Sequence, residues 1–213
     1  MEFFMIIFKK TILALTGLFI CIFLIAHLGA NFLLLLPEEQ ARVMYNNYSS
    51  ALRGNVFISV IAYINYACIL FHVGYAIVVT RRNKAARNDR YLINHTSENS
   101  SWTSQNMMLL GAIIFCFIVI HMANFWFKVK IQGHHEDLYQ MVIDLFKDPI
   151  YLAIYVIASL PLGLHLSHGV QSAFKTLGLY HHRYVGWMAR ISMAYALVIG
   201  CGFGIIPIIL FFR

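Results

Sequence analysis

The amino-acid sequence predicts an all-α integral membrane protein built as a bundle of five transmembrane helices. Hydrophobic residues make up 60% of the 213-residue chain and charged residues only 12%, and the mean hydropathy is +0.69. A soluble domain does not need so large an apolar fraction to fill its core. The apolar residues also gather into runs of about 20 or more, the length that crosses ~30 Å of hydrocarbon. The chain is therefore expected to lie among membrane lipid.

Five apolar runs have the length of a membrane span. They are Thr11–Leu36, Val56–Thr80, Met107–Phe127, Ile150–Phe174 and Gly186–Phe212. The connectors are too short to hold a second domain, so residues 1–213 are expected to form a single transmembrane domain. The four cysteines lie alone in separate runs, without the CxxCH spacing that attaches haem covalently.

Lysine and arginine are unevenly divided between the two sides of the predicted bundle. Six lie opposite the N-terminus, and ten lie on its side: Lys9, Lys10, Arg81, Arg82, Lys84, Arg87, Arg90, Lys175, Arg183 and Arg190. The positive-inside rule then predicts a cytoplasmic N-terminus and an external C-terminus, in the inner (cytoplasmic) membrane of the cell. Such a basic inner face either docks an acidic soluble partner or only determines the orientation of the chain in the membrane. Because the basic residues sit in connectors between spans, a nucleic-acid partner is not expected.

The two outer connectors carry the periodicity of short amphipathic helices. Apolar residues recur every three or four positions in both. They are Ala41, Met44, Tyr45, Tyr48 and Leu52 in the first, and Leu138, Met141, Val142, Leu145 and Phe146 in the second. Both helices are expected to lie on the outer surface.

Histidines inside the spans are the candidate functional residues. Five of the ten lie there: His27, His72, His121, His165 and His168. An ionisable group in hydrocarbon is costly, so each indicates either a functional site or a hydrogen bond between helices. Imidazole is also a common ligand for iron.

Four of these histidines sort into two layers. His27 and His121 fall in the outer halves of their spans, and His72 and His165 fall in the inner halves. The layers differ by about seven residues of helix, or ~11 Å. This arrangement suits two stacked haem b groups, each with neutral imidazoles at both axial positions of the iron and no open position for oxygen. Zinc would need more ligands at each site.

Nearby glycines are consistent with a flat macrocycle, although small residues also serve helix packing in lipid. Gly29, Gly74 and Gly169 lie two, two and four residues after His27, His72 and His165. His168 lies one turn beyond His165, and periodicity leaves both open as the fourth ligand.

Several segments share a family pattern. They are AHLGANF around His27, FHVGYAI around His72, SSWTSQNMMLLG at the third span, HMANFWF around His121, LHLSHG in the fourth span and the inner connector KAARNDRYLIN. With these segments the chain resembles, nearly end to end, the di-haem, five-helix cytochrome b subunit of succinate dehydrogenases and fumarate reductases, of the type with a single anchor subunit.

The resemblance implies a ligand set. In this family the fourth ligand is a histidine followed four residues later by glycine, which selects His165 with Gly169 and leaves His168 beside the site. It implies His72 with His165 for the inner, proximal haem and His27 with His121 for the outer, distal haem. In one fumarate reductase branch a glutamate two residues before the fourth ligand serves proton transfer. Gly163 stands at that position, so this proton route is not implied.

The implied function is electron relay between an iron–sulfur subunit on the inner face and a membrane quinone, more often menaquinone in this family. A flavoprotein subunit of the same complex would interconvert succinate and fumarate. The chain itself has neither a dinucleotide-binding glycine fingerprint nor an iron–sulfur cysteine cluster. A quinone site is expected near the distal haem, where Glu38, Glu39 or His134 either exchange protons with it or are solvated loop residues.

The sequence leaves alternatives for three further residues and for the function of the chain. Arg190 either pairs with a propionate of the proximal haem or reaches the inner interface, and His181 and His182 either contact the partner or are simply exposed. A second interpretation is the cytochrome b anchor of another dehydrogenase or hydrogenase. A third is a transporter without haem, although no acidic residue lies inside a predicted span.

Overall fold

The structure, a computed structural model, describes residues 2–85, 101–134, 136–179, 181 and 183–213, with side chains from Phe8 onward. Its long helices are α1 (Glu2–Phe32), α3 (Val56–Ala85), α6 (Met107–Met122), α9 (Pro149–Thr176) and α10 (Val185–Phe212). A π-helical turn, η2 (Ala123–Phe127), and the short α7 (Lys128–Lys130) extend α6. The all-α fold is as the composition predicts.

All five predicted spans are confirmed. The described segments long and apolar enough to cross a membrane are Phe8–Leu35, Val56–Ala85, Met107–Lys130, Pro149–Thr176 and Val185–Phe212. Their ends differ from the predicted ones by at most five residues. The largest difference is at the end of α3, where helix continues through Arg81, Arg82 and Lys84 because these residues are good helix formers despite their charge.

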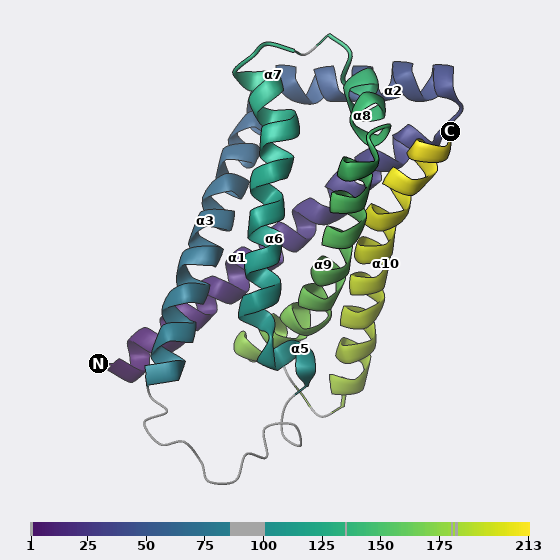
Figure 1. Ribbon diagram of the computed structural model, residues 1–213. Helices are drawn as coiled ribbons and strands as arrows, with labels where there is room; N and C mark the ends of the chain where they lie inside the picture. The colour runs from purple at the N-terminus through teal and green to yellow at the C-terminus, as the bar shows by residue number, and fades with distance from the viewer. Residues whose placement is uncertain (1, 86–100, 135, 180, 182) are drawn as a thin grey trace.

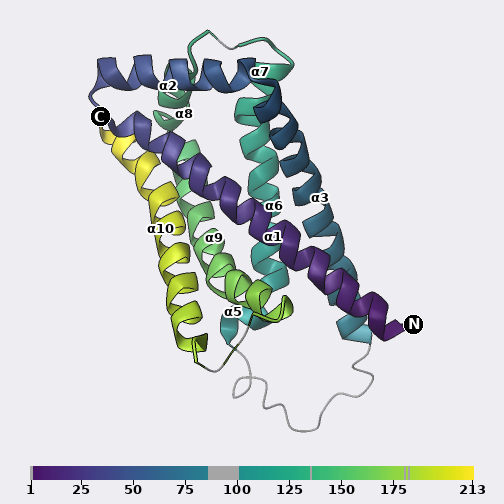
Figure 2. The ribbon, with the colours of Figure 1, turned by 180° about the vertical axis from the view of Figure 1, so that it is seen from behind.

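The helices form an open bundle with the chain termini at opposite ends (Figure 1). The helix α1 crosses the bundle obliquely, which is clearest from behind in Figure 2, and it packs mainly against α3. The helices α9 and α10 lie side by side and make the most extensive contact between helices of the described chain. An end of the bundle that also holds the C-terminus is covered by α2 (Glu38–Gly54), and it is called the α2 end below.

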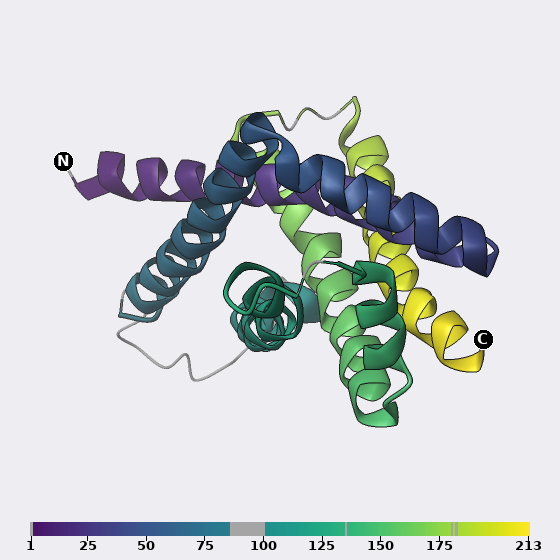
Figure 3. The same cartoon turned by 90° about the horizontal axis from the view of Figure 1, so that it is seen from above.

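Both predicted amphipathic helices are present at the α2 end. Seen from above in Figure 3, α2 lies across the bundle, and it buries Ala41. The second helix, α8 (Leu138–Phe146), buries Tyr139, Val142 and Phe146. The buried stripe of α8 therefore includes Tyr139, whereas the predicted Leu138 is only half-buried. The backbone N–H of Tyr139 donates to Asn46 Oδ1 at 3.0 Å, which holds this residue against α2.

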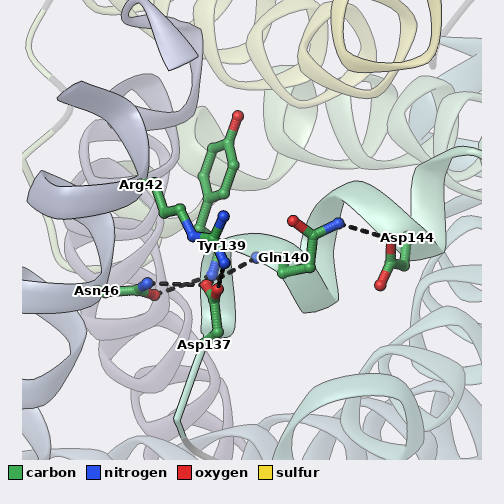
Figure 4. A network of polar contacts seen from close by, with 6 residues as sticks. All are labelled: Arg42, Asn46, Asp137, Tyr139, Gln140 and Asp144. Carbon is green, nitrogen blue, oxygen red and sulfur yellow. Dashed lines mark hydrogen bonds and ion pairs between the residues drawn. The ribbon is translucent and has the colours of Figure 1, made fainter. Parts of the chain in front are cut away.

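A polar network joins α2 to the start of α8 (Figure 4). Asp137 caps α8 by accepting from the Gln140 backbone N–H at 3.1 Å. The same carboxylate accepts from Asn46 Nδ2 at 2.8 Å and forms an ion pair with Arg42. Burial alone would raise the pKa of Asp137, but these hydrogen bonds and the Arg42 guanidinium together hold it below its ordinary value. The network therefore fixes the surface helices to each other.

Small residues bring α9 and α10 close together. Ser192, Ala196, Gly200 and Gly204 recur at every fourth position of α10, and all four are buried. A Cβ on Gly200 would stand 3.1 Å from the Cα of Gly163 in α9, and a Cβ on Gly204 would stand 2.7 Å from Ser159 Oγ. In lipid, helices associate through such close backbone packing. Gly163 thus lies where the two backbones meet.

Charges divide between the two ends of the bundle. The N-terminal end holds the described basic residues Lys9, Lys10, Arg81, Arg82, Lys84, Lys175, Arg183 and Arg190, whereas Arg87 and Arg90 lie outside the described residues. The α2 end holds as many acidic as basic residues: Glu38, Glu39, Glu136, Asp137, Asp144 and Asp148 beside Arg42, Arg53, Lys128, Lys130, Lys147 and Arg213. The asymmetry predicted from sequence therefore runs along the axis of the bundle.

Candidate paired-histidine sites

Two histidines face each other near the α2 end. His27 of α1 and His121 of α6 have ring centroids 5.7 Å apart, with their planes at 84°. Aromatic rings surround this outer pair: Phe23 stacks on His27 at 5.2 Å, and Phe125 lies 5.2 Å from His121. Phe203 of α10 adds a ring 5.6 Å from His27. Two histidines predicted at one depth thus meet in an apolar, aromatic environment.

A second pair lies farther toward the N-terminal end. His72 of α3 and His165 of α9 have ring centroids 6.3 Å apart, with their planes at 71°. Sequence periodicity had left His165 and His168 open as the partner. In the structure His165 faces His72, whereas His168 is half-buried one turn farther along α9. The inner pair is therefore His72 with His165.

Groups on α1 orient the ring of His72. Its Nδ1 lies 3.2 Å from the Leu13 carbonyl oxygen and 3.3 Å from Thr16 Oγ1. Thr16 Oγ1 already donates to the Ile12 carbonyl at 2.8 Å. Because a carbonyl only accepts, Nδ1 of His72 carries the hydrogen and Nε2 remains free as a ligand.

Three glycines lie against the rings of the inner pair, and Gly169 is the one among them that sequence spacing also suggests. A Cβ on Gly17 would stand 3.0 Å from His72 Cε1, and one on Gly111 would stand 3.5 Å from His165 Cε1. Gly169 also lies beside His165, with its Cβ position 4.0 Å from Cδ2. Gly29 and Gly74 have no described protein atom within 4 Å of a Cβ position. The glycines nearest the inner rings, Gly17 and Gly111, belong to helices other than those that carry the two histidines.

Behind His121 lies a tyrosine held by an asparagine. Tyr155 Oη of α9 lies 3.4 Å from His121 Nδ1. Asn124 Nδ2 donates to the same Oη at 3.2 Å. Asn124 belongs to the π-helical turn η2, and both residues are buried. A π-helical turn inside an α-helix is frequently found at functional sites.

Two buried polar atoms have no hydrogen-bond partner among the described residues. One is Nδ1 of His165, a residue of α9. The other is Oδ1 of Asn65, a residue of α3 that is 2% exposed. Buried polar groups are nearly always satisfied in proteins, so each such atom needs an explanation, for example a bound group.

The centroid separations of the two pairs match the separation expected for two imidazoles on opposite sides of one metal ion. A metal–imidazole bond is about 2 Å long, so two rings on opposite sides of one metal have centroids about 6 Å apart. The observed separations are 5.7 and 6.3 Å. Groups of three or more metal-binding side chains do not occur in the described part of the chain. A haem needs only two, because the porphyrin supplies the other ligands to iron.

The two sites are stacked along the bundle. Thr16, beside the inner pair, and His27 are 11 residues apart on α1, or about 16 Å of helix. Tyr155, beside the outer pair, and His165 are 10 residues apart on α9, or about 15 Å. The two sites therefore lie at different depths of the bundle.

Two open cavities lie at the α2 end. One, of about 500 Å³, is mostly apolar and is lined by α1 and α2, with Gly29 and Tyr48 in its wall. The other, of about 510 Å³, is polar and reaches from His134 and Asp144 to the buried Asn124. Glu38 and Glu39 are exposed and line neither of these two cavities.

The remaining predicted residues lie at the N-terminal end. Arg190 is exposed, with its guanidinium 5.3 Å from the centroid of the Trp187 ring. His181 is exposed and stacks on Tyr184 at 5.4 Å. His95, His135 and His182, like most of the KAARNDRYLIN connector, lie outside the described residues.

Comparison with protein-family models, with curated proteins and with solved structures gave no match for this chain. The functional argument therefore rests on the residues themselves.

Several residues of the sites carry no signal in the sequence. Thr16, Gly17 and Tyr155 belong to apolar runs in which similar residues occur many times. Only Asn124 stands out, since a carboxamide inside a span requires a hydrogen-bond partner. An analysis of all polar residues in the spans would have found Asn65 and Asn124 together with the histidines.

Proposed function

We propose that the chain is the membrane anchor and electron-transfer subunit of a succinate:quinone oxidoreductase, with two haem b groups. The observation that carries the proposal is the pairing of four histidines from four spans into two sites with ring centroids 5.7 and 6.3 Å apart. A single pair has an ordinary explanation as a packing contact. Two pairs at different depths of one bundle could hold two haem groups, between which electrons would cross the membrane.

His72 and His165 would hold the inner haem, and His27 and His121 the outer haem. When bound, each haem would supply a one-electron carrier. Leu13 and Thr16 orient His72 so that its Nε2 is the ligand atom. The aromatic rings around the outer pair exclude water from that site. Gly17 and Gly111 let the inner rings approach the neighbouring helices.

The partners follow from the two ends of the bundle. The basic N-terminal end would face the cytoplasm and dock an iron–sulfur subunit, which a flavoprotein subunit with the succinate and fumarate chemistry would accompany. The α2 end would face outward. A membrane quinone, proposed to be menaquinone, would bind there beside the outer pair, and the cavity between α1 and α2 has the apolar wall that a lipophilic ligand needs. His134, in the polar cavity, could exchange protons with water.

Purification of the chain from its native membranes tests the proposal. We expect a flavoprotein and an iron–sulfur protein to co-purify, and succinate to reduce the b-haem absorbance of the complex. A matched His72→Leu variant should interrupt this reduction by removing an inner ligand, whereas His168→Leu should not. Reduction by a substrate other than succinate would assign the anchor to another dehydrogenase or hydrogenase. A colourless protein would contradict the proposal and favour the transporter.

A further inference from the structure

The environment of His121 differs from that of His72 in a way that the proposed function does not require. His72 meets a backbone carbonyl and a threonine on α1. His121 meets a buried tyrosine hydroxyl on α9, and that hydroxyl is itself held by an asparagine of η2. Every residue of a helix has a backbone carbonyl, whereas a tyrosine hydroxyl and an asparagine amide are present only where the sequence places them.

The hydroxyl of Tyr155 can serve as the acceptor that a histidine bound to iron through Nε2 needs at its Nδ1. Its hydroxyl oxygen has two lone pairs and one hydrogen. Asn124 Nδ2 donates to one lone pair at 3.2 Å. The second lone pair can accept from His121 Nδ1, 3.4 Å away. In that arrangement Nδ1 of His121 carries the hydrogen, and Nε2 is left without one.

The surroundings hold Tyr155 in this position. Its ring makes edge-to-face contacts with Phe117 at 4.9 Å and with Phe146 at 5.0 Å. Such aromatic contacts favour one orientation of the ring. Tyr155 is 8% exposed and Asn124 is 7% exposed. The hydroxyl is therefore fixed by two elements that carry none of the four paired histidines. They are the turn η2, through Asn124, and the surface helix α8, through Phe146.

The π-helical turn explains how Asn124 reaches the tyrosine. Asn124 follows His121 by three residues on the same helix. The turn Ala123–Phe127 widens the backbone immediately after His121, which changes the direction in which the next side chains project. Asn124 is buried against α9 while it also borders the polar cavity of the α2 end.

We propose that Tyr155, fixed by Asn124, is the positioning residue of the outer site: it accepts the Nδ1 hydrogen of His121 and thereby presents Nε2 as the iron ligand. An acceptor that holds the Nδ1 hydrogen of a histidine ligand orients the ring and increases its basicity. The inner site has the Leu13 carbonyl and Thr16 in the same role. The two sites are thus oriented independently, from α9 and from α1. The proposal rests on the proposed function, since it assumes that the outer pair binds haem.

A redox titration of the purified chain, followed at the b-haem absorbance, tests this role. The outer haem is identified as the one lost in His121→Leu. In Tyr155→Phe we expect the midpoint potential of the outer haem to rise, because a less basic imidazole stabilises ferric iron less, and the inner haem to keep its potential. Loss of the outer haem alone would support the same role, since removal of a group that hydrogen-bonds a metal ligand weakens metal binding by about 10- to 100-fold.

Tyr195→Phe is the matched control. Its hydroxyl donates to the Cys21 carbonyl at 2.8 Å, so the variant also removes a tyrosine hydrogen bond between two spans, but away from the histidines. It should leave both potentials unchanged. Asn124→Val, which keeps Tyr155 but frees it, should affect the same haem as Tyr155→Phe and no other.

Two results would overturn the inference while the proposed function stands. One is a two-haem protein in which Tyr155→Phe shifts neither potential. The other is an equal shift of both haems, or the same shift in Tyr195→Phe, which would indicate a general effect on packing. A wild-type chain without haem would instead refute the proposed function, and the positioning role with it.

Discussion

At the scale of single residues, the inner site depends on a choice between two histidines one turn apart. The ring of His165 faces His72 at 6.3 Å, and its Nδ1 is buried without a partner among the described residues. His168 is half-buried and lies nearer to the positive charge of Lys175. The geometry therefore separates two residues that periodicity could not.

Replacement of each histidine by leucine should give different haem contents. We expect His165→Leu to reduce the haem content from two to one per chain, because the inner site loses an axial ligand. His168→Leu should keep two, which makes it the matched control. Pyridine haemochrome quantitation against polypeptide concentration provides the measurement. Two haems in the His165 variant and one in the His168 variant would reverse the assignment.

At the scale of elements, the contact between α9 and α10 depends on residues without side chains. In Gly200→Leu the new Cβ would stand 3.1 Å from the Gly163 backbone, which cannot move aside as a flexible side chain can. We expect a loss of about 1–3 kcal/mol in the free energy of unfolding, the usual cost of overpacking. Unfolding in mixed detergent micelles measures it. Gly186→Leu, at a position with no described atom within 4 Å of its Cβ, should show no comparable loss.

The surface helices depend on Asp137, which joins α2 to the N-terminus of α8. Asp137→Ala should cost about 1 kcal/mol at neutral pH, as loss of an N-cap does. The pKa of this carboxyl is lowered in the folded protein. Its contribution is therefore complete above about pH 4, the ordinary range of an aspartate, and is lost as the pH falls through the lowered pKa.

Thermal unfolding in detergent between pH 7 and pH 2 tests this element. The difference in Tm between wild type and Asp137→Ala should be present at pH 7 and should shrink toward zero at the acidic end. Asp144→Ala is the control, since Asp144 accepts a hydrogen bond from Gln140 of its own helix. A difference that stays constant with pH would show that the carboxylate charge has no part in it.

At the scale of the whole molecule, the charge distribution predicts the orientation in the membrane. The basic end carries the N-terminus, and the α2 end, where acidic and basic residues balance, lies near the C-terminus. Alkaline phosphatase, which needs disulfides and so an oxidising compartment, should be active when fused after Arg213 and inactive when fused before Met1. The opposite pattern would invert the membrane topology and move the docking face outside.

The sequence predicts the bundle well because its signals are local. Runs such as Val56–Thr80 and Gly186–Phe212 have the length and composition of spans, whatever surrounds them. The histidine layers are also local, since depth follows from the position within a span. What the sequence does not contain is the rotation of each helix about its axis. Gly17 therefore lies against His72, and Tyr155 against His121, without any signal in the chain around them.

The most direct test of the account is the reduced-minus-oxidised visible spectrum of the detergent-purified chain, together with the haem content per polypeptide. The paired histidines predict two low-spin b haems per chain, one of which disappears when either member of a pair is replaced by leucine. A purified and folded chain without haem absorbance would contradict the account, since the two pairs would then be contacts between helices.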